Sequence, residues 1–223
     1  MTFSVVARDA SGAFGSAICS SSPAVAARCV HLADGVGGVN SQNITDPRLG
    51  PAVLNRLRTR LSAAEALQEV VDASAHVEFR QLLVVDAAGR TAAYSGRRAL
   101  GIFGDASGDG VVAGGNMLAS AAIPQLMVDA FAAASGELEL RLLAAMDAAR
   151  DAGGEAGPVH SAGLSVVRDA GWRVTDLRVD WTEGDPIAEL GDLVRRWMPQ
   201  RDDYVTRGLD PSTAPSYGVP GDE

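Results

Sequence analysis

The chain has 223 residues, of which 47% are hydrophobic and 21% charged, and its formal net charge is −9. This composition is typical of one globular domain or two closely fused ones, and the negative charge argues against binding to nucleic acid or to an anionic membrane surface. No apolar run reaches the roughly 20 residues that cross a bilayer, and no secretory signal is recognisable, so we expect a cytoplasmic protein.

The N-terminal stretch predicts a β-hairpin. Residues 2–8 alternate between apolar and more polar side chains, which indicates a strand with two unlike faces. Turn residues at 9–12 lead into a second apolar run, 13–20, that ends in serines. Pairing of the first and last turn residues would place Thr2 opposite Cys19 and beside those serines.

Hydrophobic periodicity predicts further strands and helices along the rest of the chain. Apolar residues at three- and four-residue spacing indicate helices, and two alternating runs around a glycine-containing turn indicate a hairpin. Residues 23–32 suit either a short helix or a buried connection. Helices are expected at 47–60, 62–73, 124–134, 138–151 and 186–197, hairpins at 78–95 and 161–179, and single strands at 34–43 and 111–113.

Cap residues indicate where two of these helices begin. Asp46 precedes Pro47, which suits a capped helix with proline in its first turn. Ser62 is followed three residues later by Glu65, the pattern of a capping box. Further along, the spacing of apolar residues places Leu126 on the buried face of its helix.

The order of elements favours an α+β fold. Strands in antiparallel pairs and helices in pairs disfavour a doubly wound parallel sheet. We expect residues 1–198 to form one domain, a four-layer α-β-β-α sandwich of two antiparallel sheets flanked by helix pairs. Residues 199–223 are rich in proline and aspartate, so they suit either a disordered tail or an extended arm packed on its own domain or a neighbour, and they have too many prolines for a helix.

The sequence contains no lysine, so all 19 basic residues are arginines. This excludes a P-loop lysine, a Schiff-base lysine and the Ser-x-x-Lys pair of β-lactamase-type enzymes. The α-amino group is then the only amine in the protein. Arginine cannot replace it as a base, because its guanidinium stays protonated at any working pH.

The cysteines and histidines do not form a recognisable metal site. The cysteines are Cys19 and Cys29, and the histidines are His31, His76 and His160. Cys29 and His31 are two residues apart, but no second such pair completes the spacing of a structural zinc site. We expect neither a metal nor an organic cofactor.

Thr2 would become the N-terminal residue if Met1 were removed. It would then carry a hydroxyl group and a free α-amine, whose ordinary pKa of about 7.7–8.0 allows the amine to be neutral near pH 7. Such an amine can take the proton of the hydroxyl, as in enzymes with an N-terminal threonine nucleophile. The simpler interpretation is an ordinary residue after an initiator methionine.

Acyl transfer also requires hydrogen-bond donors for the developing oxyanion. Asn116 follows two glycines at a strand end and is our candidate for this donor, although a turn residue would look the same. Gln42 and Asn43 end a glycine-rich strand, so they would either bind the substrate or cap the following helix.

Three more polar residues are candidates for substrate binding. Ser20 and Ser21 lie beside Thr2 in the predicted hairpin, so one of them would orient the α-amine, or both are ordinary strand-end serines. His160 precedes Ser161, but Val159 stands where the nucleophile elbow of serine hydrolases needs glycine. His160 therefore lines the cleft or is a hydrogen-bonded strand residue.

Several short motifs along the chain are specific when taken together. They are residues 1–9, 41–43, 46–51, 80–82, 84–86, 115–118, 153–155, 160–164, 176–180 and 215–223. With these motifs the chain resembles an uncharacterised bacterial family, domain of unknown function 1028, of the N-terminal-nucleophile (Ntn) hydrolase superfamily. The resemblance implies an αββα fold in which Thr2 is the nucleophile and its own α-amine the base. Residues 156–160 lack the basic stretch that many members have, so a substrate-contacting arginine there would be missing.

We therefore expect an amidohydrolase in which Thr2, freed by removal of Met1, forms an acyl-enzyme with a small amide or related acyl compound. The alternative is a non-catalytic protein that retains Met1 and binds a small metabolite or a partner protein. We expect a small-molecule substrate, no nucleic-acid or membrane partner, and at least a homodimer.

Overall fold

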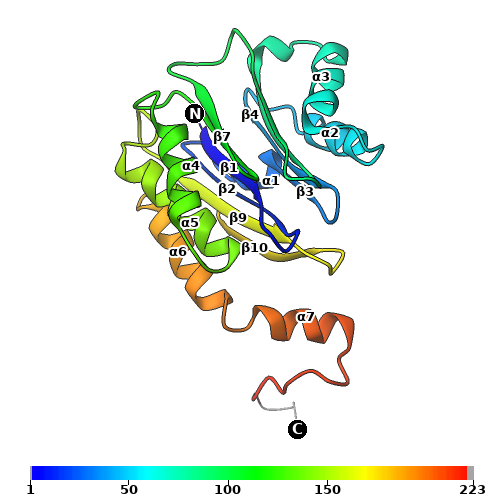
Figure 1. The fold of residues 1–223 in the computed structure, drawn as a ribbon. Helices are drawn as coiled ribbons and strands as arrows, with labels where there is room; N and C mark the ends of the chain where they lie inside the picture. The colour runs from blue at the N-terminus through cyan, green and yellow to red at the C-terminus, as the bar shows by residue number, and fades with distance from the viewer. Residues whose placement is uncertain (1, 220–223) are drawn as a thin grey trace.

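The computed structural model describes residues 2–219, which form four layers (Figure 1). Two antiparallel sheets stack face to face, and helices cover their outer faces. The predicted α-β-β-α sandwich is therefore confirmed. Within residues 2–219, no helix is long and apolar enough to cross a membrane.

The described residues contain ten strands and seven helices. The strands are β1 (Thr2–Arg8), β2 (Phe14–Ser20), β3 (Val30–Ala33), β4 (Gly37–Asn43), β5 (Arg80–Asp86), β6 (Thr91–Ser95), β7 (Gly104–Gly108), β8 (Val111–Asn116), β9 (Ser161–Val167) and β10 (Arg173–Val179). The helices are α1 (Val25–Cys29), α2 (Leu49–Leu57), α3 (Ala63–Ala73), α4 (Ile123–Ala133), α5 (Leu138–Asp151), α6 (Pro186–Trp197) and α7 (Arg201–Leu209), with a 3₁₀ turn, η1, at Val77–Phe79.

The larger sheet has the strand order β10-β9-β2-β1-β8-β7, and the smaller one the order β3-β4-β5-β6. Helices α4, α5 and α6 cover the outer face of the larger sheet, and α2 and α3 cover that of the smaller one (Figure 1). β1 thus lies in the middle of the larger sheet, between β2 and β8. This position makes β1 a central strand of the fold.

The alternating side chains of β1 have different surroundings. Phe3 and Val5 belong to the core beneath α4, α5 and α6. Val6, on the opposite face, packs between the two sheets against Leu83 and Val85. Burial of apolar side chains on both faces fixes the register of the strand, because a shift by one residue would exchange the faces. The two unlike faces predicted for this strand are confirmed.

The first hairpin differs from the prediction by one residue. Two backbone hydrogen bonds of 3.0 and 3.1 Å close a turn in which Gly12 has a φ of +96°. A type I turn followed by a left-handed residue is one residue longer than the expected turn. The longer turn pairs Phe3 with Cys19, so Ser20, and not Cys19, lies beside Thr2.

Two helices differ from the prediction in detail. α2 begins at Leu49 rather than at Pro47, so Asp46 lies before its cap position, where its carboxylate accepts the backbone N–H of Arg48 and binds the guanidinium of that residue at 2.7 Å. In α4, Leu126 is 43% exposed rather than buried, whereas Met127 is buried as the spacing predicts. The capping box predicted at the start of α3 is confirmed.

The C-terminal segment contains a helix that the sequence did not predict. Residues 201–209 form α7, because no proline occurs between Pro199 and Pro211, so the stretch between them is free to form a helix. Tyr204 stacks on Trp197 with ring centroids 5.2 Å apart. Arg201 is 2% exposed and its guanidinium lies 2.9 Å from the carboxylate of Glu139, which is 1% exposed. α7 thus contacts α5 and α6, whereas most residues from 210 to 219 are exposed, with contacts to α7 through Arg207 and Tyr204. Residues 220–223 of the expected arm lie outside the described residues.

Candidate active site at the start of β1

Thr2 begins the central strand, and its side chain lies in the layer between the two sheets. The residue is only 4% exposed, and its Oγ1 donates a hydrogen bond to Oγ of Ser20 over 3.3 Å. Ser20 Oγ lies 2.9 Å from Oγ of Ser22, which accepts a hydrogen bond of 2.6 Å from the guanidinium of Arg28. A chain of hydroxyl groups therefore runs from Thr2 to a half-buried cation.

Asn116 lies directly opposite Thr2 on the neighbouring strand β8 and is fully buried. Its Nδ2 donates to Oε1 of Gln81 over 3.2 Å, whereas its Oδ1 has no hydrogen-bond partner among the described residues. An oxyanion requires a donor, so only Nδ2 of this amide could serve the predicted role. The structure therefore brings Asn116 and Thr2 together. The Nδ2 group of Asn116, which donates to Gln81, is also the group that would donate to a bound ligand.

Gln42 joins the two sheets through both ends of its amide group. Its Oε1 accepts a hydrogen bond of 2.6 Å from Ser4, and its Nε2 donates to Oε1 of Gln81 at 2.8 Å and to the carbonyl of Gly114 at 3.3 Å. Gln81 in turn donates to the carbonyl of Gly115 at 3.0 Å. Gln42 is thus close to the site, but its polar atoms contact the protein, and its predicted contact with substrate stays a prediction.

The layer between the sheets is polar at the Thr2 end and apolar at the Arg8 end. Buried polar groups need partners, so the amides and hydroxyls at the Thr2 end form a connected network. Gln81, a member of this network, was not among the sequence candidates. Its only signal was a polar side chain in front of the apolar run that forms β5.

Asn43 lies at the end of β4 and is engaged by the loop that follows β6. Its backbone has a φ of +73°, a conformation that asparagine tolerates better than most residues. Its Nδ2 donates to the carbonyl of Phe79, and its Oδ1 accepts the backbone N–H of Leu100 at 3.2 Å. The side chain therefore fixes the loop, and its predicted contact with substrate also stays untested.

His160 lies beside the end of β2, where its backbone N–H donates to the carbonyl of Ser20 over 2.9 Å. Its ring stacks on Trp181, with centroids 4.2 Å apart and an angle of 14°. The ring Nδ1 lies 2.8 Å from the carbonyl of Thr182. The predicted contact of His160 with substrate stays a prediction.

Glu155 is the site residue that the sequence analysis missed. It lies in the connection between α5 and β9, is 4% exposed, and accepts the backbone N–H of Ser21 on Oε1 at 3.1 Å. Its Oε2 is buried without a hydrogen-bond partner among residues 2–219. Burial raises the pKa of the Glu155 carboxyl to about 7, although the hydrogen bond from Ser21 opposes this. Its signal in the sequence was the motif 153–155, part of the family resemblance, which does not place Glu155 beside Thr2.

Comparison with known proteins assigns the chain to a family. The family model "Family of unknown function (DUF1028)" matches residues 2–190. The chain belongs to this family. The resemblance of its sequence motifs is thereby confirmed, and the match includes Thr2, Asn116 and Glu155.

The chain is also similar to solved structures. A crystal structure of a DUF1028 protein from Silicibacter pomeroyi has 30% sequence identity and a TM-score of 0.84, over 92% of this chain and 94% of that one. Anbu (ancestral beta-subunit) from Yersinia bercovieri has 12% identity and a TM-score of 0.41, over 89% and 97% of the two chains. An Anbu mutant from Hyphomicrobium sp. strain MC1 has 12% identity and a TM-score of 0.42, over 92% and 99%. These two scores are too low to carry an argument about function, and no curated protein matches the chain.

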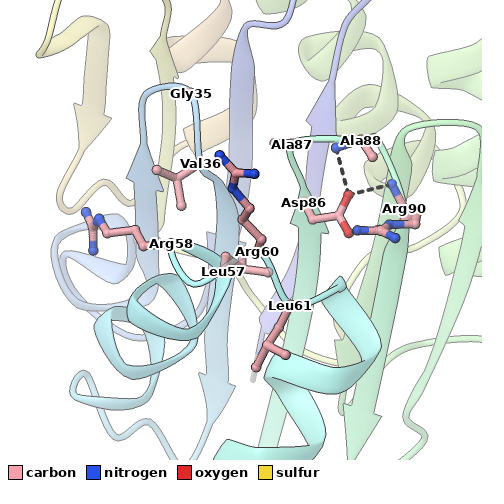
Figure 2. Close-up of a pocket in the computed structure, with 10 residues that line it drawn as sticks. All are labelled: Gly35, Val36, Leu57, Arg58, Arg60, Leu61, Asp86, Ala87, Ala88 and Arg90. Atoms are coloured by element: carbon pink, nitrogen blue, oxygen red, sulfur yellow. Dashed lines mark hydrogen bonds and ion pairs between the residues drawn. The ribbon is translucent and has the colours of Figure 1, made fainter.

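Thr2 is not among the residues that line five surface pockets of residues 2–219. One pocket of about 410 Å³ is lined by Asp86, at the end of β5, and by Ala87 and Ala88 of the turn that follows (Figure 2). Its lining includes Arg58, Arg60 and Arg90, and Arg90 binds the carboxylate of Asp86 at 2.7 Å. Within residues 2–219, no group of three or more acidic, histidine or cysteine side chains could hold a metal ion.

Proposed function

We propose that this DUF1028 protein is an Ntn-type amidohydrolase. Removal of Met1 would free Thr2 as the nucleophile, and a small amide or related acyl compound would be the substrate. The observation that carries the proposal is the position of Thr2 at the start of a central strand. There its hydroxyl is hydrogen-bonded to Ser20, and a buried amide, Asn116, lies opposite.

The reaction begins when Oγ1 of Thr2 attacks the carbonyl carbon of the substrate. The hydroxyl proton passes to the neutral α-amine, a new O–C bond forms, and the carbonyl electron pair moves onto oxygen. Nδ2 of Asn116 would donate to this oxyanion. The C–N bond then breaks, and the leaving amine takes the proton from the α-ammonium. Water attacks the remaining ester with the α-amine again as base, the bond between Oγ1 and the acyl carbon breaks, Oγ1 takes the proton from the α-ammonium, and the acid leaves.

The serines at the end of β2 suit two supporting roles. Ser20 accepts the hydroxyl hydrogen of Thr2 in the resting protein, which holds Oγ1 in one orientation. Ser21 follows directly in the chain, and its hydroxyl would contact the α-amine, as expected from the sequence. Gln42 and Asn43 would shape the site through the contacts that they make with the neighbouring strands and loop.

The first test is the intact mass of the purified protein, followed by assays on acyl p-nitroanilides and p-nitrophenyl esters and by labelling with a β-lactone. We expect Met1 to be absent and one acyl adduct to form on Thr2. Thr2→Ala should abolish turnover and labelling, with circular dichroism unchanged, whereas Thr2→Ser should retain part of the rate. Thr213→Ala, which changes an exposed threonine of the tail, is the matched control. Full activity of Thr2→Ala would contradict the proposal.

A second candidate function rests on the arginine-lined pocket. Figure 2 shows the guanidinium of Arg60 between the labelled Val36 and Ala87, while the carboxylate of Asp86 points toward Arg90, which neutralises its charge. A pocket of this kind in an acidic protein suits a small anionic metabolite, as expected of a non-catalytic protein that retains Met1. Retained Met1, together with a melting temperature that citrate or phosphate raises in the wild type but not in Arg60→Ala, would favour this alternative.

A further inference from the structure

Glu155 lies across the end of β1 and contacts both neighbouring strands. On one side its Oε1 accepts the backbone N–H of Ser21, the first residue after β2. On the other side Glu155 forms an antiparallel β-bridge with Leu118, two residues beyond the end of β8. β1 runs between these two strands and begins at Thr2. A residue that reaches both neighbours just past their ends must face the end of the strand between them.

The two carboxylate oxygens of Glu155 differ in their hydrogen bonds. Oε1 is used by Ser21, but Oε2 is buried and has no hydrogen-bond partner within residues 2–219. A buried acceptor without a partner is costly, and a buried carboxylate needs a cation or several donors. A chain that begins with Thr2 would supply both, since its α-ammonium carries a positive charge and three N–H donors.

From this arrangement we infer that Glu155 is a positioning residue for the α-amine of Thr2. This inference rests on the proposed function, because the α-amine of Thr2 exists only after Met1 has been removed. Oε2 of Glu155 accepts a hydrogen bond from the amine and aims its lone pair at the hydroxyl of the same residue. Thr2 is thus held on two sides, by Ser20 at its hydroxyl and by Glu155 at its nitrogen.

Glu155 also stabilises the charge that forms during the reaction. When the α-amine takes the hydroxyl proton it becomes an ammonium, and a buried carboxylate beside it favours this form, as the aspartate of a serine-protease triad favours the imidazolium. The proton stays on nitrogen and is returned to the leaving amine, so Glu155 remains ionised. Two other titratable groups lie near it. The charge of His160 lowers the pKa of Glu155, and the buried thiol of Cys19 keeps a raised pKa, mainly through burial, so it stays neutral.

The absence of lysine makes the α-amine directly measurable. Its rate of acylation by an N-hydroxysuccinimide ester can be followed by intact mass at a series of pH values, because the chain offers no other amine. On protein shown by mass to begin at Thr2, we expect Glu155→Gln to lower the midpoint of this pH profile by about one unit. Below the midpoint, acylation would then be about tenfold faster. Glutamine keeps the oxygen that accepts from Ser21, so a purely structural role would leave the midpoint unchanged.

Two further variants make the test specific. Glu183→Gln removes an exposed carboxylate near His160 and should keep the wild-type midpoint, and Glu155→Asp, which keeps the charge, should stay closer to wild type than Glu155→Gln. If Glu155→Gln does not fold, the wild-type protein provides the test. A carboxylate partner should raise the midpoint of its acylation profile above about 7.7–8.0, the ordinary pKa of an α-amine. An unshifted midpoint would overturn the role of Glu155 alone. Retained Met1 would instead overturn the proposed function, and this role with it.

Discussion

Replacing Gln42 by methionine would remove the hydrogen bonds that join the two sheets at the Thr2 end, while nearly keeping the volume of the side chain. Gln42 is fully buried and takes part in three hydrogen bonds, to Ser4 at 2.6 Å, Gln81 at 2.8 Å and the carbonyl of Gly114 at 3.3 Å. Methionine cannot replace any of them in this layer. The substitution therefore isolates the polar network from packing.

The size of the effect follows from which groups are left without a partner. Oε1 of Gln81 still accepts from Asn116, so its loss is small. The hydroxyl of Ser4 loses its partner in a buried layer, at about 1–3 kcal/mol, whereas the carbonyl of Gly114 lies in a strand paired on both sides and loses less. We expect Gln42→Met to lower the free energy of unfolding by about 1–3 kcal/mol, and Gln42→Ala by roughly 2 kcal/mol more through the cavity it leaves.

Urea unfolding followed by circular dichroism measures both losses. The midpoint should fall for both variants with an unchanged slope, since the surface exposed on unfolding is the same. Gln68→Ala is the matched control, because that glutamine is exposed on α3 and bonds only Asp72 of the same helix. A loss below about 1 kcal/mol for Gln42→Met would refute the reasoning that this network stabilises the contact between the sheets.

Two other predictions concern acid stability and assembly. Burial alone would raise the pKa of Asp86, but hydrogen bonds from Ala63, Arg90 and Ala88 hold it below its usual range. The ionised carboxylate of Asp86 therefore stabilises the fold above the unfolded pKa of about 3.9, and this stabilisation is lost as the pH falls through the folded pKa. Asp86→Asn should unfold at a lower urea concentration than the wild type at pH 7. Its free energy of unfolding should fall less steeply than that of the wild type below pH 4. The apolar side chains of Leu100, Ile102 and Phe103 are exposed, and we expect light scattering to give at least twice the chain mass of 23.0 kDa, whereas a monomer would contradict this.

Strong periodicity made much of the fold predictable. α5 and α6 occupy the predicted ranges, because their apolar stripes and their ends are both marked in the sequence. β7, by contrast, has the sequence Gly-Asp-Ala-Ser-Gly and was missed. It is an edge strand held by its backbone pairing with β8, and such pairing leaves no hydrophobic alternation to detect.

The candidate site was predictable only where it depends on local sequence. The first hairpin brought Thr2 to the serines, and a turn longer by one residue changed which neighbour faces it. Glu155 could not be placed, because its contact with Ser21 joins residues that are 134 positions apart and depends on how the connection after α5 folds back. Polar residues at strand ends also look alike whether they face solvent or, like Gln42, a second sheet.

The ion pair between Glu139 and Arg201 affects how far a stable fragment of this chain must extend. The family match stops at residue 190, yet Arg201, eleven positions later, is buried against a carboxylate of α5. A chain cut between these points would leave Glu139 charged in an apolar setting, with the hydroxyl of Thr175 at 2.7 Å as its remaining partner. The shortest fragment in which buried Glu139 keeps its arginine partner therefore includes α7 and extends past residue 190, where the family match ends.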